Sequence, residues 1–118
     1  MYQRHEIGKS GEDIATEFLQ KRNYTIIKRN FQCRQGEIDI IAFDNCNQEY
    51  VFIEVKTRSN FNYGKPIEAV NSIKQKHIVA ATKYYIYANK IENKYMRFDI
   101  ITIYKKRICH YKNCEFCL

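Results

Sequence analysis

Apolar residues recur in the first part of the chain at the spacing of an amphipathic helix. The face that they form holds Ile14, Ala15, Phe18 and Leu19. Ser10, with Asp13 three residues later, is typical of a helix N-cap, and Asn23 ends the pattern. We therefore expect a first helix between Ser10 and Asn23 that buries one face against the rest of the protein.

Three runs with the composition of β-strands follow, at residues 24–29, 37–43 and 50–56. The polar segment 45–48 separates the second run from the third. It is short enough to be the loop of a β-hairpin, so these two strands are expected to pair.

The hairpin loop decides which residues share a face. Counting outward from it places Asp44 opposite Glu49 and Asp39 opposite Glu54. One face then holds Asp39, Ile41, Phe43, Phe52, Glu54 and Lys56. The other face holds Ile38, Ile40, Val51, Ile53 and Val55. Since both faces carry large apolar residues, we expect this pair of strands to be covered on both sides.

A second, longer helix is predicted from Pro66, which suits a first helical turn, to about Lys90. Its expected buried positions are Val70, Ile73, His77, Ala80, Ala81, Tyr84 and Ala88. Strands at residues 98–104 and 108–111 complete the order α-β-β-β-α-β-β. This order implies an α/β fold with a central mixed β-sheet flanked by helices. The long helix makes the third and fourth strands a parallel pair, or takes the fourth strand to a new place in the sheet.

With 118 residues, 45% of them hydrophobic and 28% charged, the chain has the size and composition of one domain over residues 1–118. Its apolar runs are only a few residues long, so no membrane span is expected. The polar stretch after Met1 holds no apolar signal region, which makes the cytoplasm the default location. Five cysteines, an odd number, then indicate reduced thiols rather than disulfides.

Charge is divided unevenly along the chain. The formal net charge is +7, with −2 over residues 1–55 and +9 over residues 56–118. A basic half on a small domain attracts polyanions such as DNA, because bound lysines and arginines release counterions from a phosphate backbone. The alternative is that the lysines only keep the protein in solution.

The hairpin places two carboxylates and a lysine in an apolar surround. At a separation of about 4 Å and an effective dielectric of about 20, Asp39 and Glu54 repel by about 4 kcal/mol. A shared proton, the ammonium of Lys56 or a divalent metal would relieve this repulsion. The alternatives are a hydrated edge with Lys56 and Arg58 as ordinary ion-pair partners, or a register slip that separates the pair. We favour the metal, since Mg²⁺ or Mn²⁺ on two carboxylates beside a lysine suits phosphodiester hydrolysis.

Asp39, followed on the next strand by Glu54-Val55-Lys56, resembles the D…(D/E)-x-K site of the PD-(D/E)XK superfamily of restriction-endonuclease-like nucleases. The local details are most similar to the YraN family of small bacterial nuclease-like proteins, which is similar to archaeal Holliday junction resolvases. The segments that carry this resemblance are residues 8–12, 29–30, 36–39, 52–58 and 97–99. They occur in order and span most of the chain.

The resemblance implies a restriction-endonuclease-like fold in which Asp39 and Glu54 hold Mg²⁺ or Mn²⁺ and Lys56 is the catalytic lysine. It also implies that Glu12, on the first helix, is a further acid near the metal. Without the resemblance, Glu12 reads as an acid in the first helical turn that faces the helix dipole.

Further residues are candidates for contact with nucleic acid. Arg58 lies just beyond the catalytic strand, and Lys74, Gln75 and Lys76 match the helix that flanks the site in such nucleases. The three helix residues could equally be a solvated face. The polar loop at residues 59–63 could fold over a strand, with Phe61 or Tyr63 stacking on a base.

The C-terminal residues invite a zinc interpretation. Cys109, His110, Cys114 and Cys117 are compressed into the last ten residues, whereas a structural zinc site usually has two ligand pairs set apart by a knuckle or a helix. Free thiols are therefore expected, and His77 is expected to be packed on the apolar face of its helix.

The sequence thus predicts a metal-dependent endonuclease that acts on DNA, with branched DNA as one substrate. A homodimer is expected only by analogy with resolvases. The first rival is a nucleic-acid-binding module that keeps the fold without useful catalysis. The second is a protein-interaction domain whose basic surface is incidental.

Overall fold

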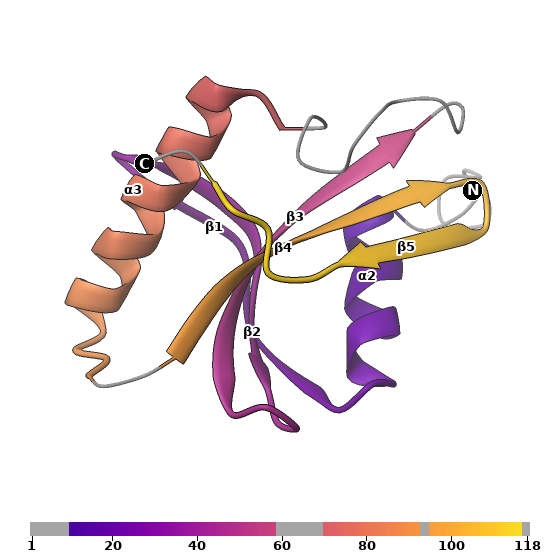
Figure 1. The fold of residues 1–118 in the computed structure, drawn as a ribbon, viewed down its shortest axis with the longest axis horizontal. Helices are drawn as coiled ribbons and strands as arrows, with labels where there is room; N and C mark the ends of the chain where they lie inside the picture. The colour runs from indigo at the N-terminus through magenta and orange to yellow at the C-terminus, as the bar shows by residue number, and fades with distance from the viewer. Residues whose placement is uncertain (1–9, 59–69, 93–94, 117–118) are drawn as a thin grey trace, which may run out of the picture.

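The computed structural model describes residues 10–58, 70–92 and 95–116. The elements, in chain order, are α2 (Gly11–Gln20), β1 (Tyr24–Cys33), β2 (Gly36–Asp44), β3 (Glu49–Arg58), α3 (Ser72–Ala88), β4 (Tyr95–Tyr104) and β5 (Arg107–Tyr111). This is the predicted order α-β-β-β-α-β-β (Figure 1). The first, second and third strands are all longer than the sequence patterns indicated.

The five strands form one mixed sheet in the order β1-β2-β3-β4-β5. Neighbouring strands are antiparallel except β3 and β4, which are parallel. The long helix α3 makes the crossover that a parallel pair needs. The mixed sheet flanked by helices is confirmed and is consistent with the restriction-endonuclease-like fold that was expected.

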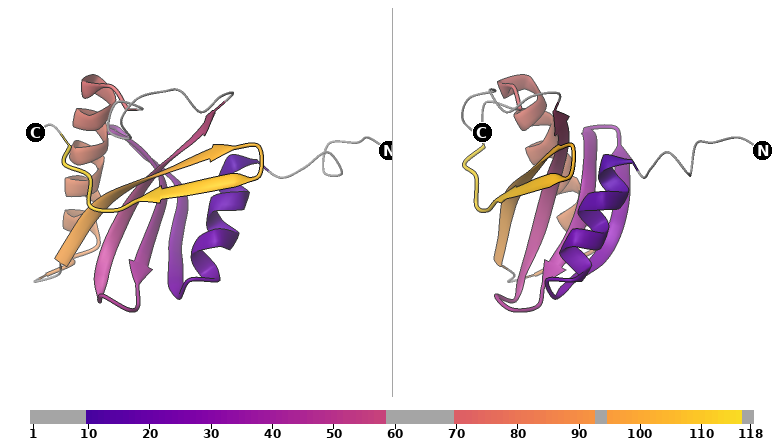
Figure 2. Two further views of the ribbon diagram at one scale, coloured as in Figure 1. Left: turned by 45° about the vertical axis from the view of Figure 1, so that its right-hand side comes forward. Right: turned by 90° about the vertical axis from the view of Figure 1, so that its right-hand side faces the viewer.

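The two helices cover opposite faces of the sheet, as Figure 2 shows. On the α2 face, Ala15 and Leu19 pack against Ile40, Val51 and Ile53. On the α3 face, Ile78, Val79 and Tyr85 pack against Ile41 and Phe52. The expectation that the central hairpin is covered on both sides is therefore confirmed.

Local sequence signals account for how α2 begins. The Ser10 hydroxyl accepts a hydrogen bond from the Asp13 N–H at 3.1 Å, which is the predicted N-cap. Glu12 and Asp13 then both pair with Arg29 of β1. These ion pairs hold the start of α2 against the edge of the sheet.

The hairpin of β2 and β3 has the predicted register near its turn and departs from it farther out. Asp44 lies opposite Glu49, as counted, and the ladder of paired residues ends at Ile40 and Ile53. Beyond that pair β2 and β3 diverge, with β2 turning toward α3 (Figures 1 and 2). We call this place the fork.

The fork explains one wrong assignment. Ile38 was expected on the face of Ile40, but it lies in the core under α3 together with Phe31. The simple alternation of strand faces fails here because the paired strands β1 and β2 bend at the fork, and Asn30 adopts a positive φ of 53° at this level.

The buried face of α3 is also different from the predicted one. The helix buries Gln75, Ile78, Val79, Ala81, Thr82 and Tyr85. Ile73 and Tyr84 are exposed, and so is His77, which was expected to be packed. The prediction relied on aromatic and aliphatic residues alone, whereas the helix turns two polar side chains, Gln75 and Thr82, inward.

Some predictions lie outside the described residues: the start of the second helix at Pro66, the loop at residues 59–63 with Phe61 and Tyr63, and Cys117. Within the described residues, no helix is long and apolar enough to cross a membrane.

Candidate functional site

Asp39 sits at the fork, where it takes over a contact that the β-ladder no longer makes. Its Oδ2 atom accepts a hydrogen bond from the backbone N–H of Val55 at 2.8 Å. The Asp39 carboxylate is thereby held against β3, one residue beyond Glu54. The predicted direct pairing of Asp39 with Glu54 is replaced by this side-chain contact, which still brings the two acids together.

Glu54 is the buried acid of the site, with its side chain only 4% exposed. Two lysines approach its Oε2 atom: Lys56 Nζ at 3.6 Å and Lys74 Nζ at 3.8 Å. Lys56 comes from the same strand, and Lys74 comes from the first turn of α3. Both distances are those of ion pairs rather than of close hydrogen bonds.

The other carboxylate oxygen, Glu54 Oε1, is buried and makes no hydrogen bond to any described residue. Burial and the neighbouring charge of Asp39 raise the pKa of Glu54 to about 7, against the opposing effect of Lys74 and Lys56. A buried carboxylate with an unsatisfied oxygen is costly unless a proton or a cation joins it.

The arrangement therefore fits a cation held between Asp39 and Glu54. These two carboxylates would be its protein ligands, because within the described residues no group of three or more histidine, cysteine, aspartate or glutamate side chains could hold a metal. Two carboxylates suit Mg²⁺, which keeps several water ligands and is commonly bound through one or two carboxylates. The same donors also accept Mn²⁺.

Glu12, the further acid that the resemblance implied, lies on the helix that covers the opposite face of the sheet from Glu54. Glu54 lies on the face of α3, next to Lys74, while Glu12 forms its ion pair with Arg29 at 3.1 Å. Alternation along β3 explains this, because Glu54 follows Phe52 on the face that α3 covers.

The predicted nucleic-acid contacts occupy different environments. Lys74 points to Glu54 and is part of the acidic site itself. Gln75 is buried, with its amide donating to the carbonyl of Val70 at 2.7 Å, and Lys76 is exposed. Arg58 is half-buried at the end of β3. The reading of residues 74–76 as one solvated face is therefore wrong.

A second buried charge cluster surrounds Arg97 on β4. Its guanidinium pairs with Asp44 at 2.8 Å, with Asp99 at 3.0 Å and with Glu49, and it donates to the Tyr24 hydroxyl at 2.7 Å. Sequence reasoning noted Arg97 and Asp99 as part of a family motif but gave them no role. The charges on alternate positions of an otherwise apolar strand were the signal.

Asp99 joins this cluster to the end of β5. His110 Nε2 lies 2.7 Å from its Oδ2 atom, and the N–H of Asn113 donates to Oδ1 at 2.9 Å. Burial opposes ionisation, but the hydrogen bonds from His110, Arg97 and Asn113 lower the pKa of Asp99. His110 is thus engaged with a carboxylate, and Cys109 and Cys114 form no disulfide among the described residues; the preference for free thiols over a zinc site stays a prediction.

Comparison with known proteins places the chain in a family. Residues 11–103 match the profile of the Uncharacterised protein family UPF0102. A UPF0102 protein of Caldicellulosiruptor saccharolyticus is 43% identical over 101 residues, which cover 86% of this chain and 84% of the relative.

Two further relatives agree. A UPF0102 protein of Clostridium botulinum is 47% identical over 103 residues, covering 86% of this chain and 82% of the relative. One of Persephonella marina is 42% identical over 106 residues, covering 90% of each chain. The resemblance to the YraN family is thereby confirmed, while the placement in the PD-(D/E)XK superfamily stays a prediction. The chain belongs to the uncharacterised protein family UPF0102.

Proposed function

We propose that this protein is a metal-dependent nuclease that hydrolyses phosphodiester bonds of DNA, with branched DNA as a candidate substrate. One observation carries the proposal: the buried Glu54 carboxylate lies beside Asp39 and within 4 Å of two lysine ammonium groups. A cluster of acids and lysines at a strand fork is costly for stability, and such costs are typical of functional sites.

Asp39 and Glu54 would hold Mg²⁺ or Mn²⁺. Glu54 Oε1 has no hydrogen-bond partner among the described residues, so a cation could satisfy it without displacing a contact. Asp39 Oδ2 accepts the Val55 N–H, which holds this second carboxylate beside Glu54. When bound, the metal would polarise the scissile phosphate and lower the pKa of an attacking water.

Lys56 is the proposed catalytic lysine. Its ammonium lies 3.6 Å from Glu54 Oε2 and is one third exposed, so it can reach a phosphate while it remains at the acids. In hydrolysis the water gives up a proton as its oxygen bonds to phosphorus, the P–O bond to the leaving strand breaks, and the leaving oxygen takes up a proton. Lys56 would stabilise the negative charge that develops on the phosphate oxygens.

The proposal gives the remaining basic residues a binding role. Arg58 follows Lys56 by two residues at the end of β3, and Lys76 is an exposed residue of α3. Both would contact phosphates of the backbone without regard to base sequence. Lys74 would serve the site itself, because its ammonium lies 3.8 Å from Glu54.

A nucleic-acid-binding module without catalysis is the second candidate. The observation that favours it is that Lys56 and Lys74 already offset the charge of Glu54 without a metal. In that case the acids and lysines would be a buried ion cluster, and DNA would bind only through the basic surface.

The decisive experiment incubates linear and branched DNA with the protein in Mn²⁺ or in EDTA, beside the variants Asp39→Asn and Glu54→Gln. We expect cleavage that needs the metal and is lost in both variants, while the exposed-site control Glu115→Gln cleaves normally. Binding without cleavage by the wild-type protein would favour the module, and cleavage by Asp39→Asn at the wild-type rate would refute the site.

A further inference from the structure

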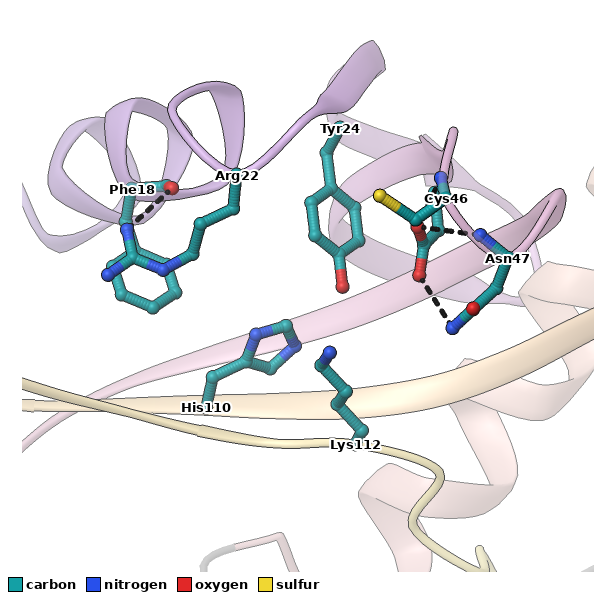
Figure 3. A pocket seen from close by; sticks show the side chains of 8 residues that line it. Phe18, Arg22, Tyr24, Cys46, Asn47, His110 and Lys112 are labelled. Atoms are coloured by element: carbon teal, nitrogen blue, oxygen red, sulfur yellow. Dashed lines mark hydrogen bonds between the residues drawn. The ribbon is translucent and has the colours of Figure 1, made fainter.

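A pocket of about 370 Å³ lies between the C-terminal end of α2, the β2–β3 turn and the end of β5. Figure 3 shows the side chains that line it. Those that matter here are Phe18, Arg22, Tyr24, Asn47, His110 and Lys112. Glu49, at the level of this turn, and Glu54 are five residues apart on β3, or about 16 Å along the strand. The pocket is therefore separate from the acidic site.

Two cations stand at this pocket, and the structure orients one of them. The Arg22 guanidinium carbon lies 3.7 Å from the centre of the Phe18 ring, and Nη1 donates to the Phe18 carbonyl at 3.2 Å. Stacking on an aromatic ring reduces the entropy that the arginine loses when it binds a ligand. Lys112, just after β5, supplies the second positive charge.

The inner wall of the pocket carries polar side chains that hydrogen bonds to the Arg97 cluster hold in place. The Tyr24 oxygen accepts a hydrogen bond from Arg97 at 2.7 Å, so its own O–H proton is available to a different acceptor. His110 Nε2 lies 2.7 Å from Asp99 Oδ2, and this contact holds the imidazole ring beside the Tyr24 ring. In Figure 3 the Tyr24 hydroxyl, the His110 ring and the Lys112 ammonium converge on one space.

Asp44 also lines the pocket, but other groups of the protein already bind its carboxylate. Asp44 accepts hydrogen bonds from the N–H groups of Cys46 and Asn47 and pairs with Arg97. Asp99 and Glu49 pair with the same arginine from behind. The pocket groups that can bind an oxyanion are therefore the Tyr24 O–H and the two cations, Arg22 and Lys112.

The size of the pocket and its aromatic walls further restrict the class of ligand that it can bind. A volume of about 370 Å³ exceeds that of an inorganic phosphate and falls at the lower end of small-molecule sites. Phe18 and Tyr24 each contact the His110 ring, with centroids 5.9 and 6.0 Å apart. These rings offer an apolar surface to a planar group.

We propose that this pocket binds a phosphate monoester attached to a nucleoside, with Arg22 and Lys112 on the phosphate and the Tyr24 hydroxyl as a further donor. Two sources share this chemistry: a free mononucleotide and the phosphorylated end of a DNA strand. The site does not depend on the proposed nuclease activity.

The test measures binding of deoxyadenosine monophosphate, inorganic phosphate, and a short DNA strand with or without a 5′-phosphate, by calorimetry. We expect saturable binding of the nucleotide, weaker binding of phosphate, and a double variant Arg22→Ala, Lys112→Ala that binds at least about tenfold more weakly. The charge-matched control Lys21→Ala, Lys83→Ala removes two exposed lysines outside the pocket and should bind like the wild type.

Tyr24→Phe keeps the ring and removes the hydroxyl, so it should also weaken the binding of the nucleotide. Lys56→Ala should bind the nucleotide normally, which separates this site from the acidic one. Tight binding of the DNA strand only when it is phosphorylated would identify strand ends as the source. Absence of saturable nucleotide binding, or an equal loss in the control variant, would overturn the proposal.

Discussion

Glu54 shows how one buried side chain makes stability depend on pH. Its pKa is raised from 4.5 to about 7, so the folded protein holds this proton more tightly than the unfolded chain does. Its contribution to the free energy of unfolding is therefore largest below pH 4.5 and falls as the pH rises through 7. The site is most destabilising where it would be most able to bind a metal.

We predict that Glu54→Gln stabilises the metal-free protein above neutral pH. The gain over the wild type should approach about 3 kcal/mol at pH 8 and vanish near pH 4, because glutamine carries no charge to bury. Urea unfolding in EDTA across this pH range measures it. The exposed control Glu115→Gln should follow the wild type, and an equal gain at every pH would contradict the prediction.

Arg97 is the residue on which the second charge cluster depends. Burial alone would lower the pKa of its guanidinium, but the hydrogen bonds that it donates to Asp99, Asp44 and Glu49 hold that pKa above its usual value. Arg97→Met would leave three carboxylates near one another without their shared cation.

We expect Arg97→Met to lower the free energy of unfolding by about 3–5 kcal/mol at neutral pH. Part of this loss should be recovered at low pH, where the abandoned carboxylates take up protons. Thermal unfolding at two pH values tests both statements. Arg34→Met, at an exposed position, serves as the control, and a loss as small as that of the control would show that the cluster contributes little.

At the scale of elements, the packing of α3 on the sheet depends on a close approach at Gly36. A Cβ atom at this position would lie 2.7 Å from the backbone carbonyl oxygen of His77. Because that atom belongs to the helix backbone, it cannot move aside without moving α3. The first residue of β2 thus has room only for a glycine.

Gly36→Ala should therefore cost about 1–3 kcal/mol of stability, since the helix or the strand must shift. Any such shift also moves Lys74 relative to Glu54, so the proposed DNA cleavage should fall together with the stability. Urea unfolding of this variant beside the exposed neighbour Gln35→Ala separates the steric effect from a general effect of alanine here. An unchanged unfolding midpoint would mean that α3 is not held at this point.

At the scale of the molecule, the two classes of basic residue should be separable. Lys56 lies at the acids, whereas Lys76 is exposed on α3. A lysine that acts in the transition state changes the rate of cleavage more than it changes binding. A lysine that contacts only phosphate changes binding and its dependence on salt.

Lys56→Ala should remove most cleavage. It should weaken DNA binding only as much as the loss of one phosphate contact does. Lys76→Ala should weaken binding to all DNA sequences and reduce the salt slope by about one unit, with cleavage of saturating DNA retained. Gel shifts at several salt concentrations and a cleavage assay measure these effects. If Lys56→Ala cleaves saturating DNA at the wild-type rate, Lys56 is not catalytic.

Much of the fold follows from the sequence because its signals are local. The Ser10 cap, the four-residue hairpin turn and the register from Asp44 to Ile40 depend on residues that are near in the chain. Short-range periodicity and turn chemistry decide such features before any tertiary contact forms. The hairpin count also predicted that Asp39 lies near Glu54, but the structure brings them together through the bond from the Val55 N–H to Asp39 rather than by direct pairing.

The remaining features required the tertiary structure. The fork, the inward turn of Gln75, and the approach of Lys74 to Glu54 depend on how α3 packs across the sheet. Arg97 reaches Asp44 across 53 positions of sequence and Tyr24 across 73. Local patterns show which residues are buried but not which partner neutralises a buried charge, because that choice is made by elements that are distant in the chain.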